Sequence, residues 1–366
     1  MGSKLRVGVI GVGGIAENKH LPGWTNLPDV EVVALSDVAA NRLDIVGDKF
    51  GIKQRFIDFE DMLGLDLDIV DVCTPNRIHT LAVTAALGAG KHVICEKPLA
   101  VTTDEVRSMG ELADARGLKL MTAQHFRYTA AAQAVRKWVD VGGLGKVYHA
   151  RVHATRRARI PISPGFLNKD LSGGGPCMDV GVHALDLCLW LMDHPTPSRV
   201  SGTAKTNFAR GHKIPGAWGE WDRDLVSVED FAAGFVRFRD GATLVLETSW
   251  LGHQTEKEDM SCQLFGLDGG VKWPSGEFAN VVGGALSQGS VTNPISGPPP
   301  HHAELADFAA CVMEDRPSPI PWTETIRVIA ILEAIYQSQK NGREVAIPAS
   351  GFPKLKKKRQ ADRSGF

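Results

Sequence analysis

A short glycine-rich segment near the start of the chain constrains the fold more than any other feature. Gly11-Val12-Gly13-Gly14-Ile15-Ala16 follows an apolar run at residues 5–10 and precedes a segment with helical spacing. This is the G-x-G-x-x-G/A pattern of a strand, a tight turn and a helix. Gly11 allows the turn, Gly13 lets the backbone approach a pyrophosphate, and Ala16 allows close helix–strand packing. The segment therefore predicts a Rossmann fold with a dinucleotide at the first helix N-terminus.

The alternation of strands and helices continues to about residue 122. Nearly all-apolar runs predict strands at residues 5–10, 30–36, 69–73, 92–95 and 118–123. Helical segments are predicted between them at residues 15–27, 39–50, 78–89 and 104–116. Apolar strands alternating with helices are typical of βαβ units on a doubly wound parallel sheet, with helices on both faces.

After Gly145 the pattern changes to longer strand-like runs. Strands are predicted at residues 147–155, 199–208, 230–238, 242–250 and 260–265, with hairpin turns at Asp240-Gly241 and Asp268-Gly269. A closing helix is predicted at residues 323–340. We therefore expect an α/β protein with a Rossmann domain (residues 1–122) and an α+β domain (residues 123–348). The second domain should hold a large, mainly antiparallel sheet, and residues 349–366 should form a basic, disordered tail.

Composition and charge exclude several classes of protein. A net charge of −1 gives no general attraction for nucleic acid or an anionic membrane. The most apolar long segment, residues 177–192, contains Asp179, His183 and Asp186, so a buried helix is predicted rather than a membrane span. The six cysteines are scattered, as expected for reduced thiols in the cytoplasm. His301 and His302 have no third ligand nearby in the sequence, so no metal site is predicted.

The end of the second predicted strand bears on the choice of cofactor. A carboxylate at Asp37 can accept hydrogen bonds from ribose hydroxyls and would repel a 2′-phosphate, which favours NAD over NADP. Asp37 could equally cap the following helix, and Arg42 could instead bind the phosphate of NADP. The cofactor contacts predicted in this region are Gly11, Gly13, Gly14, Ile15, Ala16, Ser36, Asp37 and Arg42.

Three further motifs carry a resemblance to a known family. The first is Glu96-Lys97-Pro98, directly after the predicted strand at residues 92–95. The second is Cys73-Thr74-Pro75-Asn76 together with His79. The third is Gly173-Gly174-Gly175-Pro176 together with Asp179, Gly181 and His183. Together they resemble the Gfo/Idh/MocA oxidoreductases over both domains, to about residue 348. The resemblance implies an NAD(P)-dependent dehydrogenase of sugar, inositol or related CH–OH groups, a cis Lys97–Pro98 peptide, and a homodimer or homotetramer. It also implies cofactor contacts from Thr74, Pro75, Asn76, His79, Glu96 and Lys97, although Asn76 could simply cap a helix.

The same resemblance assigns catalysis to Lys97, Asp179 and His183. Lys97 follows a parallel strand at the edge where ligands bind, and a cationic nicotinamide beside it would lower its basicity. Asp179 and His183 are four residues apart and would share one helix face, so the imidazole could accept a hydroxyl proton beside a carboxylate. Asp186 could orient the imidazole equally well. The competing interpretations are a surface ion pair between Lys97 and Glu96 and a buried structural histidine at position 183.

The predicted substrate contacts extend beyond the catalytic residues. They are Lys97, Arg127, Arg156, Asp179 and His183, with Arg127 taken from the resemblance and Arg156 also suited to a solvated sheet edge. Two other functions remain open at this point. A hydrolase could oxidise a sugar transiently and recycle bound NAD, and a non-enzymatic NAD-binding module would need the glycine turn but not the three catalytic residues.

Overall fold

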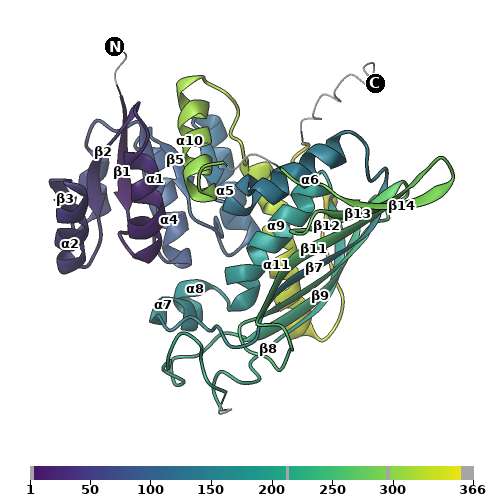
Figure 1. Cartoon of the computed structure of the whole chain (residues 1–366). Helices are drawn as coiled ribbons and strands as arrows, with labels where there is room; N and C mark the ends of the chain where they lie inside the picture. Colours follow the sequence, from purple (N-terminus) through teal and green to yellow (C-terminus); the bar gives the residue numbers. More distant parts are fainter. Residues whose placement is uncertain (1–3, 212–213, 294–296, 356–366) are drawn as a thin grey trace. The chain divides into compact units, whose positions relative to one another are not determined.

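The computed structural model describes residues 4–211, 214–293 and 297–355. The chain forms two compact units, which Figure 1 shows coloured along the sequence. The first unit comprises residues up to Tyr128 together with Gly297–Thr325. The second comprises Thr129–Ser296 and the residues from Ile326 onwards.

The first unit is built on a parallel six-stranded sheet in the order β3-β2-β1-β4-β5-β6. This is the Rossmann order, in which the direction of winding reverses between β1 and β4. The strands are β1 (Leu5–Ile10), β2 (Val30–Ser36), β3 (Gln54–Phe56), β4 (Ile69–Val72), β5 (His92–Cys95) and β6 (Leu120–Thr122). The helices are η1 (Ala16–His20), α1 (Leu21–Thr25), α2 (Ala40–Phe50), α3 (Phe59–Leu63), α4 (Asn76–Gly88), α5 (Thr103–Ala115), η2 (His125–Tyr128) and α10 (Pro300–Met313).

The predicted parallel sheet is confirmed, with two differences. The short edge strand β3 and helix α3 were not predicted. Strand β3 has only three residues, two of which are Gln54 and Arg55, so it lacks the apolar pattern of a strand. The first helix is not uniform: η1 is a π-helical turn that passes directly into α1. His20, the last residue of η1, is completely buried.

The second unit is built on a nine-stranded sheet in the order β14-β13-β12-β11-β7-β10-β9-β8-β15. All neighbouring strands are antiparallel except β7 and β10, which run parallel. The strands are β7 (Val147–Arg156), β8 (Pro197–Lys205), β9 (Phe231–Phe238), β10 (Thr243–Ser249), β11 (Glu258–Gly266), β12 (Gly269–Trp273), β13 (Glu277–Val282), β14 (Ala285–Ser290) and β15 (Val345–Ala346). The helices are α6 (Ala130–Asp140), α7 (Pro164–Leu167), α8 (Lys169–Ser172), η3 (Cys177–Gly181), α9 (Val182–Leu191), α11 (Trp322–Asn341, whose first turn belongs to the first unit) and η4 (Ala349–Gly351).

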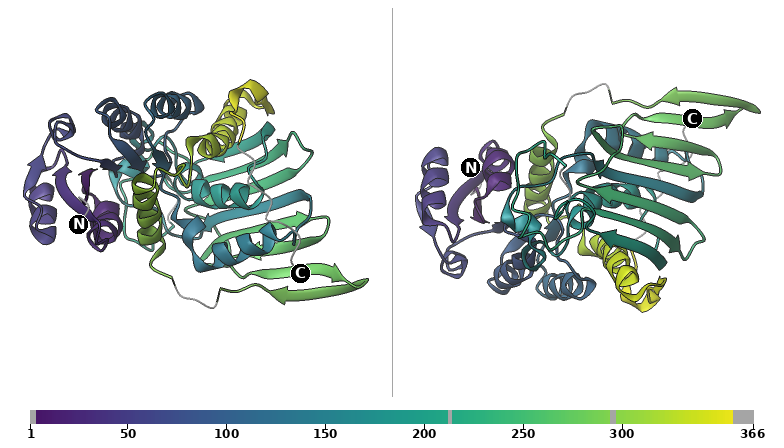
Figure 2. Two further views of the ribbon diagram at one scale, coloured as in Figure 1. Left: turned by 90° about the horizontal axis from the view of Figure 1, so that it is seen from above. Right: turned by 90° about the horizontal axis from the view of Figure 1, so that it is seen from below.

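Side chains of the large sheet alternate between a helix-covered face and a more open face. Ala150, Val152 and Ala154 of β7 are completely buried, whereas the intervening residues are partly exposed. Figure 2 shows helices α6, α9 and α11 on one face of this sheet. The predicted mainly antiparallel sheet is confirmed, as is the hairpin at Asp240-Gly241, which joins β9 to β10.

The division of the chain differs from the expected boundary at residue 122. The first unit continues to Tyr128, and the chain returns to it at Gly297–Thr325. Helix α10 explains the return, because Leu305 and Phe308 are completely buried in the same core cluster as Leu21 and Trp24. A contiguous second domain over residues 123–348 is therefore incorrect.

The first residues of the expected disordered tail, from residue 349 to residue 353, are ordered in the structure. Ala349–Gly351 forms the 3-10 turn η4, and Arg327 donates a hydrogen bond to the Pro353 carbonyl at 2.9 Å. The Arg327 guanidinium also lies over the Phe352 ring, 5.4 Å from its centroid. The basic residues Lys356, Lys357, Lys358 and Arg359 lie outside the described residues. None of the described helices combines the length and apolar character needed to span a bilayer.

Candidate functional site

The glycine turn after β1 has the geometry that a dinucleotide requires. Gly11 has a φ of +87°, and a Cβ added there would lie 2.8 Å from the Cys73 carbonyl group, so only glycine fits. A Cβ added at Gly13 would meet no atom within 4 Å. The backbone at Gly13 therefore faces open space, in which a pyrophosphate could approach it.

Asp37 and Arg42 fix the shape of this turn. Asp37 accepts hydrogen bonds from the N–H groups of Val12 (2.8 Å) and Ala39 (2.9 Å). The Arg42 guanidinium donates to the Val12 carbonyl at 3.2 Å and pairs with the Glu17 carboxylate at 2.5 Å. Because Glu17 occupies this guanidinium, the geometry disfavours the predicted contact between Arg42 and a phosphate.

The segment after β4 carries an unsatisfied polar group at the edge where the sheet winding reverses. The Thr74 hydroxyl oxygen is buried and has no hydrogen-bond partner among the described residues. Pro75 precedes α4 and Asn76 is its first residue, so Asn76 does not serve as the helix cap. A buried hydroxyl without a partner at this edge fits a site that a bound ligand completes.

His79 has a different role from the predicted cofactor contact. Its side chain is completely buried, and its two ring nitrogens lie 2.7 Å from the Pro98 carbonyl oxygen and 2.8 Å from that of Thr74. Burial lowers the pKa of His79 and favours the neutral ring, which carries one N–H and so donates to only one of these two carbonyl oxygens. The ring lies completely buried between the Thr74 and Pro98 segments.

A buried charge network connects η1, β4 and the Glu96-Lys97-Pro98 segment. His20 Nδ1 lies 2.8 Å from Asp71 Oδ2, and His20 Nε2 lies 3.0 Å from Glu96 Oε1. Trp24 Nε1 donates a second hydrogen bond to Asp71 Oδ2 at 2.7 Å. We call His20, Asp71 and Glu96 the His20 hub; all three residues are buried.

The electrostatics of the His20 hub favour an imidazolium between two carboxylates. Burial alone would lower the pKa of His20, but the Asp71 carboxylate raises it well above its usual range. Burial alone would raise the pKa of Glu96, but the hydrogen bond and charge of His20 lower it to about 2. A paired, hydrogen-bonded arrangement is what buried charges need if they are not to destabilise the fold.

The His20 hub holds the backbone of the predicted catalytic lysine. Glu96 Oε2 accepts the Lys97 backbone N–H at 2.9 Å, while the other oxygen faces His20. The Lys97–Pro98 peptide is cis, as the family resemblance implies. Glu96 thus links His20 to the Lys97 backbone, and the Lys97 charge is one of the causes that lower the pKa of Glu96.

In the second unit, the structure places Asp179 beside Arg156 and Trp250. Trp250 Nε1 donates to Asp179 Oδ2 at 3.0 Å, and Arg156 Nη1 lies 3.7 Å from the same oxygen. His183 is largely buried in the first turn of α9. Asp179 lies in the π-helical turn η3 rather than in α9, so the assumption of one regular helix face for Asp179 and His183 does not hold.

The triple-glycine turn before η3 is anchored by a buried carboxylate. Glu229 accepts hydrogen bonds from the N–H groups of Gly175 (3.0 Å) and Cys177 (3.2 Å) and from the Tyr336 hydroxyl (2.9 Å). A Cβ at Gly175 would lie 2.0 Å from the Glu229 carbonyl oxygen. Glycine at this position therefore allows the turn to lie against the Glu229 backbone. This contact fixes where η3 begins and so positions Asp179.

The two predicted arginine contacts have different surroundings. Arg127 is buried and pairs with Glu324 at 2.6 Å, which favours a packing role over the predicted substrate contact. Arg156 remains close to Asp179, pairs with Glu258 at 2.8 Å, and lies over the partly exposed Trp218 ring at 5.0 Å from its centroid.

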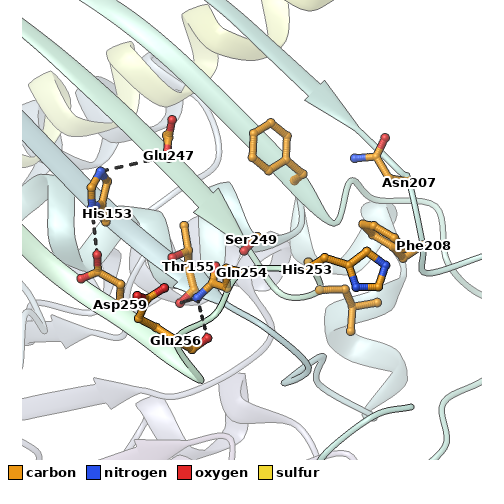
Figure 3. Close-up of a pocket in the computed structure, with 13 residues that line it drawn as sticks. His153, Thr155, Asn207, Phe208, Glu247, Ser249, His253, Gln254, Glu256 and Asp259 are labelled. Atoms are coloured by element: carbon orange, nitrogen blue, oxygen red, sulfur yellow. Dashed lines mark hydrogen bonds and ion pairs between the residues drawn. The ribbon is translucent and has the colours of Figure 1, made fainter. Parts of the chain in front are cut away.

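A separate hollow of about 360 Å³ lies on the other face of the large sheet. Figure 3 shows His153 in this hollow, between Asp259 at 2.9 Å and Glu247 at 4.0 Å. Ala154 and Arg156 point to the helix-covered face, so His153 and Thr155 point away from Asp179. This hollow is therefore distinct from the surroundings of Asp179.

Sequence reasoning missed several residues that the structure brings together. His20 is not part of the glycine fingerprint, but Asp71 is a charged residue within an otherwise apolar parallel strand. A buried acid of this kind requires a partner, and that signal could have pointed to a histidine nearby. The fold also brings His125 and Glu304 close to His301. His125 is far from His301 in the sequence, and Glu304 belongs to no motif that the sequence analysis identified.

The glycine turn predicts different effects for substitutions of Gly11 and of Gly13. Gly13→Val should weaken dinucleotide binding by at least about tenfold with little loss of stability, because its side chain enters open space meant for the ligand. Gly11→Ala should lower the free energy of unfolding by about 1 kcal/mol or more, because of its positive φ and backbone clash. Calorimetric titration and urea unfolding separate the two effects. Equal losses of stability in both variants would contradict this account of the turn.

The His20 hub predicts a pH-dependent loss of stability. His20→Leu removes the charge between Asp71 and Glu96, so at pH 8 the free energy of unfolding should fall by about 3 kcal/mol or more. Because the folded-state pKa of His20 is raised, its contribution in the wild type is fully present below about pH 6.5 and weakens at higher pH. Below about pH 6.5 only the variant still gains stability, as its unpaired carboxyls take up protons, so the loss should shrink from pH 6.5 towards pH 5. In the wild type the contribution of Glu96 is lost only as the pH falls from 4.5 towards its pKa of about 2. Urea unfolding over this range is the measurement, with His253→Leu at an exposed position as the control. A loss that does not depend on pH would contradict the ion-paired hub.

Comparison with known proteins places these features in one family. A model described as an oxidoreductase family with an NAD-binding Rossmann fold matches residues 5–124, and a Gfo/Idh/MocA C-terminal domain model matches residues 132–272. The D-glucoside 3-dehydrogenase of Escherichia coli is 32% identical over 94% of this chain and 98% of its own length.

Solved structures share the fold. An oxidoreductase domain protein from Kribbella flavida superposes with a TM-score of 0.83 at 24% identity, covering 95% of this chain and all of that one. A levoglucosan dehydrogenase in complex with NADH superposes with a TM-score of 0.82 at 22% identity, covering 94% of this chain and all of that one. The glycine turn, the Glu96-Lys97-Pro98 segment and the two matched domains therefore show that this chain belongs to the Gfo/Idh/MocA family of oxidoreductases.

Proposed function

We propose that this protein is an NAD-dependent dehydrogenase that oxidises a CH–OH group of a sugar or sugar derivative. The observation that carries the proposal is the position of Lys97, which follows β5 at the ligand-binding edge of a Rossmann sheet. Its backbone is held on both sides, by Glu96 through the N–H group and by His79 through the Pro98 carbonyl. A side chain on so rigid a support suits the positioning of a reacting hydroxyl.

We assign the remaining catalytic roles to Asp179 and His183. His183 takes the proton from the substrate hydroxyl, Lys97 polarises that oxygen, and Asp179 stabilises the charge that develops. NAD, when bound, accepts the hydride from the same carbon. The hydrogen bond from Trp250 and the nearby Arg156 guanidinium support a fixed orientation of the Asp179 carboxyl group.

We propose NAD rather than NADP as the cofactor. Its contacts would come from Gly11, Gly13, Gly14, Ile15, Ala16, Ser36, Asp37, Thr74, Pro75, Asn76 and Lys97. The Asp37 carboxylate near the turn would repel a 2′-phosphate. The pairing of Arg42 with Glu17 supports this choice, because it removes the cation best placed to bind that phosphate.

We propose a pyranose or glycoside as the substrate class. The relatives support this choice, since the E. coli protein is named for a D-glucoside and one neighbour for levoglucosan, a sugar derivative. Trp218 supports it physically: its ring is 47% exposed and lies over Arg156, near Asp179. An exposed indole offers an apolar face against which the C–H groups of a sugar ring can pack.

The proposed roles predict the behaviour of two variants. Lys97→Ala and His183→Ala should each lower kcat/KM for NAD reduction by a sugar by at least about 100-fold, since each loses a proton-handling or polarising group. His183→Ala should bind NAD with near wild-type affinity, and Lys97→Ala should lose only the contribution of its own contact, because the glycine turn is unchanged in both. The measurement is NADH absorbance with a panel of glucosides, anhydrosugars and inositols, offered with NAD or with NADP. Wild-type turnover in both variants would refute the assignment.

The alternative of a hydrolase that recycles bound NAD is not favoured, because the related proteins are dehydrogenases. The panel separates the two reactions. A dehydrogenase forms one NADH for each sugar oxidised, whereas a hydrolase releases product without net NADH. A binding module without activity would give neither signal.

We also propose that the protein forms a homodimer or homotetramer in the cytoplasm. The open face of the large sheet carries partly buried aromatic residues, Phe231, Phe235 and Phe265, which suit contact with a second copy. The cysteines are all unpaired, as expected for a reducing compartment.

A further inference from the structure

The structure brings two histidines and a glutamate together in the first unit, outside the residues assigned to catalysis. His125 lies in η2, and His301 and Glu304 lie in the first turns of α10. One ligand atom from each residue lies within 4.8 Å of the other two. His301 and Glu304 are three residues apart on the helix and so share one face. We call these residues the His125 cluster.

Glu304 shows that this cluster is incomplete. Its side chain is completely buried, and neither carboxylate oxygen has a hydrogen bond of good geometry with a described residue; the Gln124 backbone N–H acts on the group only weakly. A buried carboxyl group without a partner is costly, and a native structure that contains one requires an explanation such as a bound ion.

Each of the two histidines can offer a ring nitrogen to an ion. They are stacked with their centroids 3.8 Å apart and 19° between their planes, so one ring must turn for both lone pairs to meet at one point.

A second cluster in the same unit shows what a satisfied arrangement looks like. His20, Asp71 and Cys73 also have potential ligand atoms within 4.8 Å of one another. There, however, both His20 nitrogens face carboxylates, and Asp71 also receives hydrogen bonds from Trp24 and Cys73. That cluster has no unmet demand for a ligand, whereas Glu304 does.

We propose that His125, His301 and Glu304 bind a divalent transition-metal ion of the Zn²⁺ class. Two imidazoles and one carboxylate suit Zn²⁺ better than Ca²⁺ or Mg²⁺, which favour oxygen ligands throughout. Three protein ligands leave a fourth tetrahedral position for water. The ion links η2 to α10, the helix that returns to this unit from far along the sequence, and so stabilises the unit. The proposal does not depend on the sugar dehydrogenase activity.

Metal titration of the full chain without a polyhistidine tag tests the proposal. After treatment with chelator, the protein should take up about one Zn²⁺ in competition with a chromophoric chelator. Co²⁺ in place of Zn²⁺ should give the visible absorption typical of a four-coordinate site. His125→Ala and His301→Ala should each weaken binding by at least about tenfold, and commonly 100-fold. His302→Ala, at the neighbouring histidine, is the matched control and should bind as the wild type does.

Glu304→Leu gives a second, opposite signature. In the metal-free protein it should raise Tm, because it removes a buried carboxyl that has no hydrogen bond of good geometry. It should also abolish the rise in Tm that Zn²⁺ produces in the wild type. Absence of Zn²⁺ binding by the wild type, unchanged binding in His301→Ala, or equal loss in His302→Ala would overturn the proposal. None of these measurements involves NAD or a sugar, so failure here is distinct from failure of the proposed function.

Discussion

The buried ion pairing of His20 with Asp71 and Glu96 is the interaction on which the ligand-binding edge of the Rossmann sheet depends. It joins the helix that begins at the glycine turn, the strand at which the winding reverses, and the segment that carries Lys97. Each carboxylate would be costly in this interior without the imidazolium. One histidine therefore holds together the structures that bind the cofactor and those that position the proposed catalytic lysine.

Close backbone approach is the second constraint, and it acts in both units. Gly11 lets the first turn lie against Cys73, and Gly175 lets the triple-glycine turn lie against Glu229. A π-helical turn follows each of these glycine segments, ending at His20 in one case and containing Asp179 in the other. Such turns offset side chains from regular helical spacing and are frequent at functional sites. His20 and Asp179 are thus placed by departures from regular helix geometry.

Much of the fold was predictable because apolar strands and a glycine fingerprint leave strong local signals. The doubly wound parallel sheet and the hairpin at Asp240-Gly241 agree with the structure, as does the cis Lys97–Pro98 peptide that the family resemblance implied. The return of α10 was not predictable, because the packing of Leu305 and Phe308 on Trp24 depends on contacts far apart in sequence. The same holds for the partners of His79 and Arg42 in the structure, the Pro98 carbonyl and the Glu17 carboxylate, which lie far from them in sequence. Residue type and spacing indicated the chemistry, but tertiary partners decided which side chains remain available for it.

The central claim is that a sugar carbon gives its hydride to the nicotinamide of bound NAD. Transfer of deuterium tests this most directly: the protein is incubated with NAD and a perdeuterated glucoside, and the nucleotide is examined by NMR. We expect deuterium at C4 of the reduced nicotinamide in an amount equal to the keto-sugar formed. Keto-sugar without deuterium in the nucleotide would contradict the account, as would reduced nucleotide that carries only solvent hydrogen at that position.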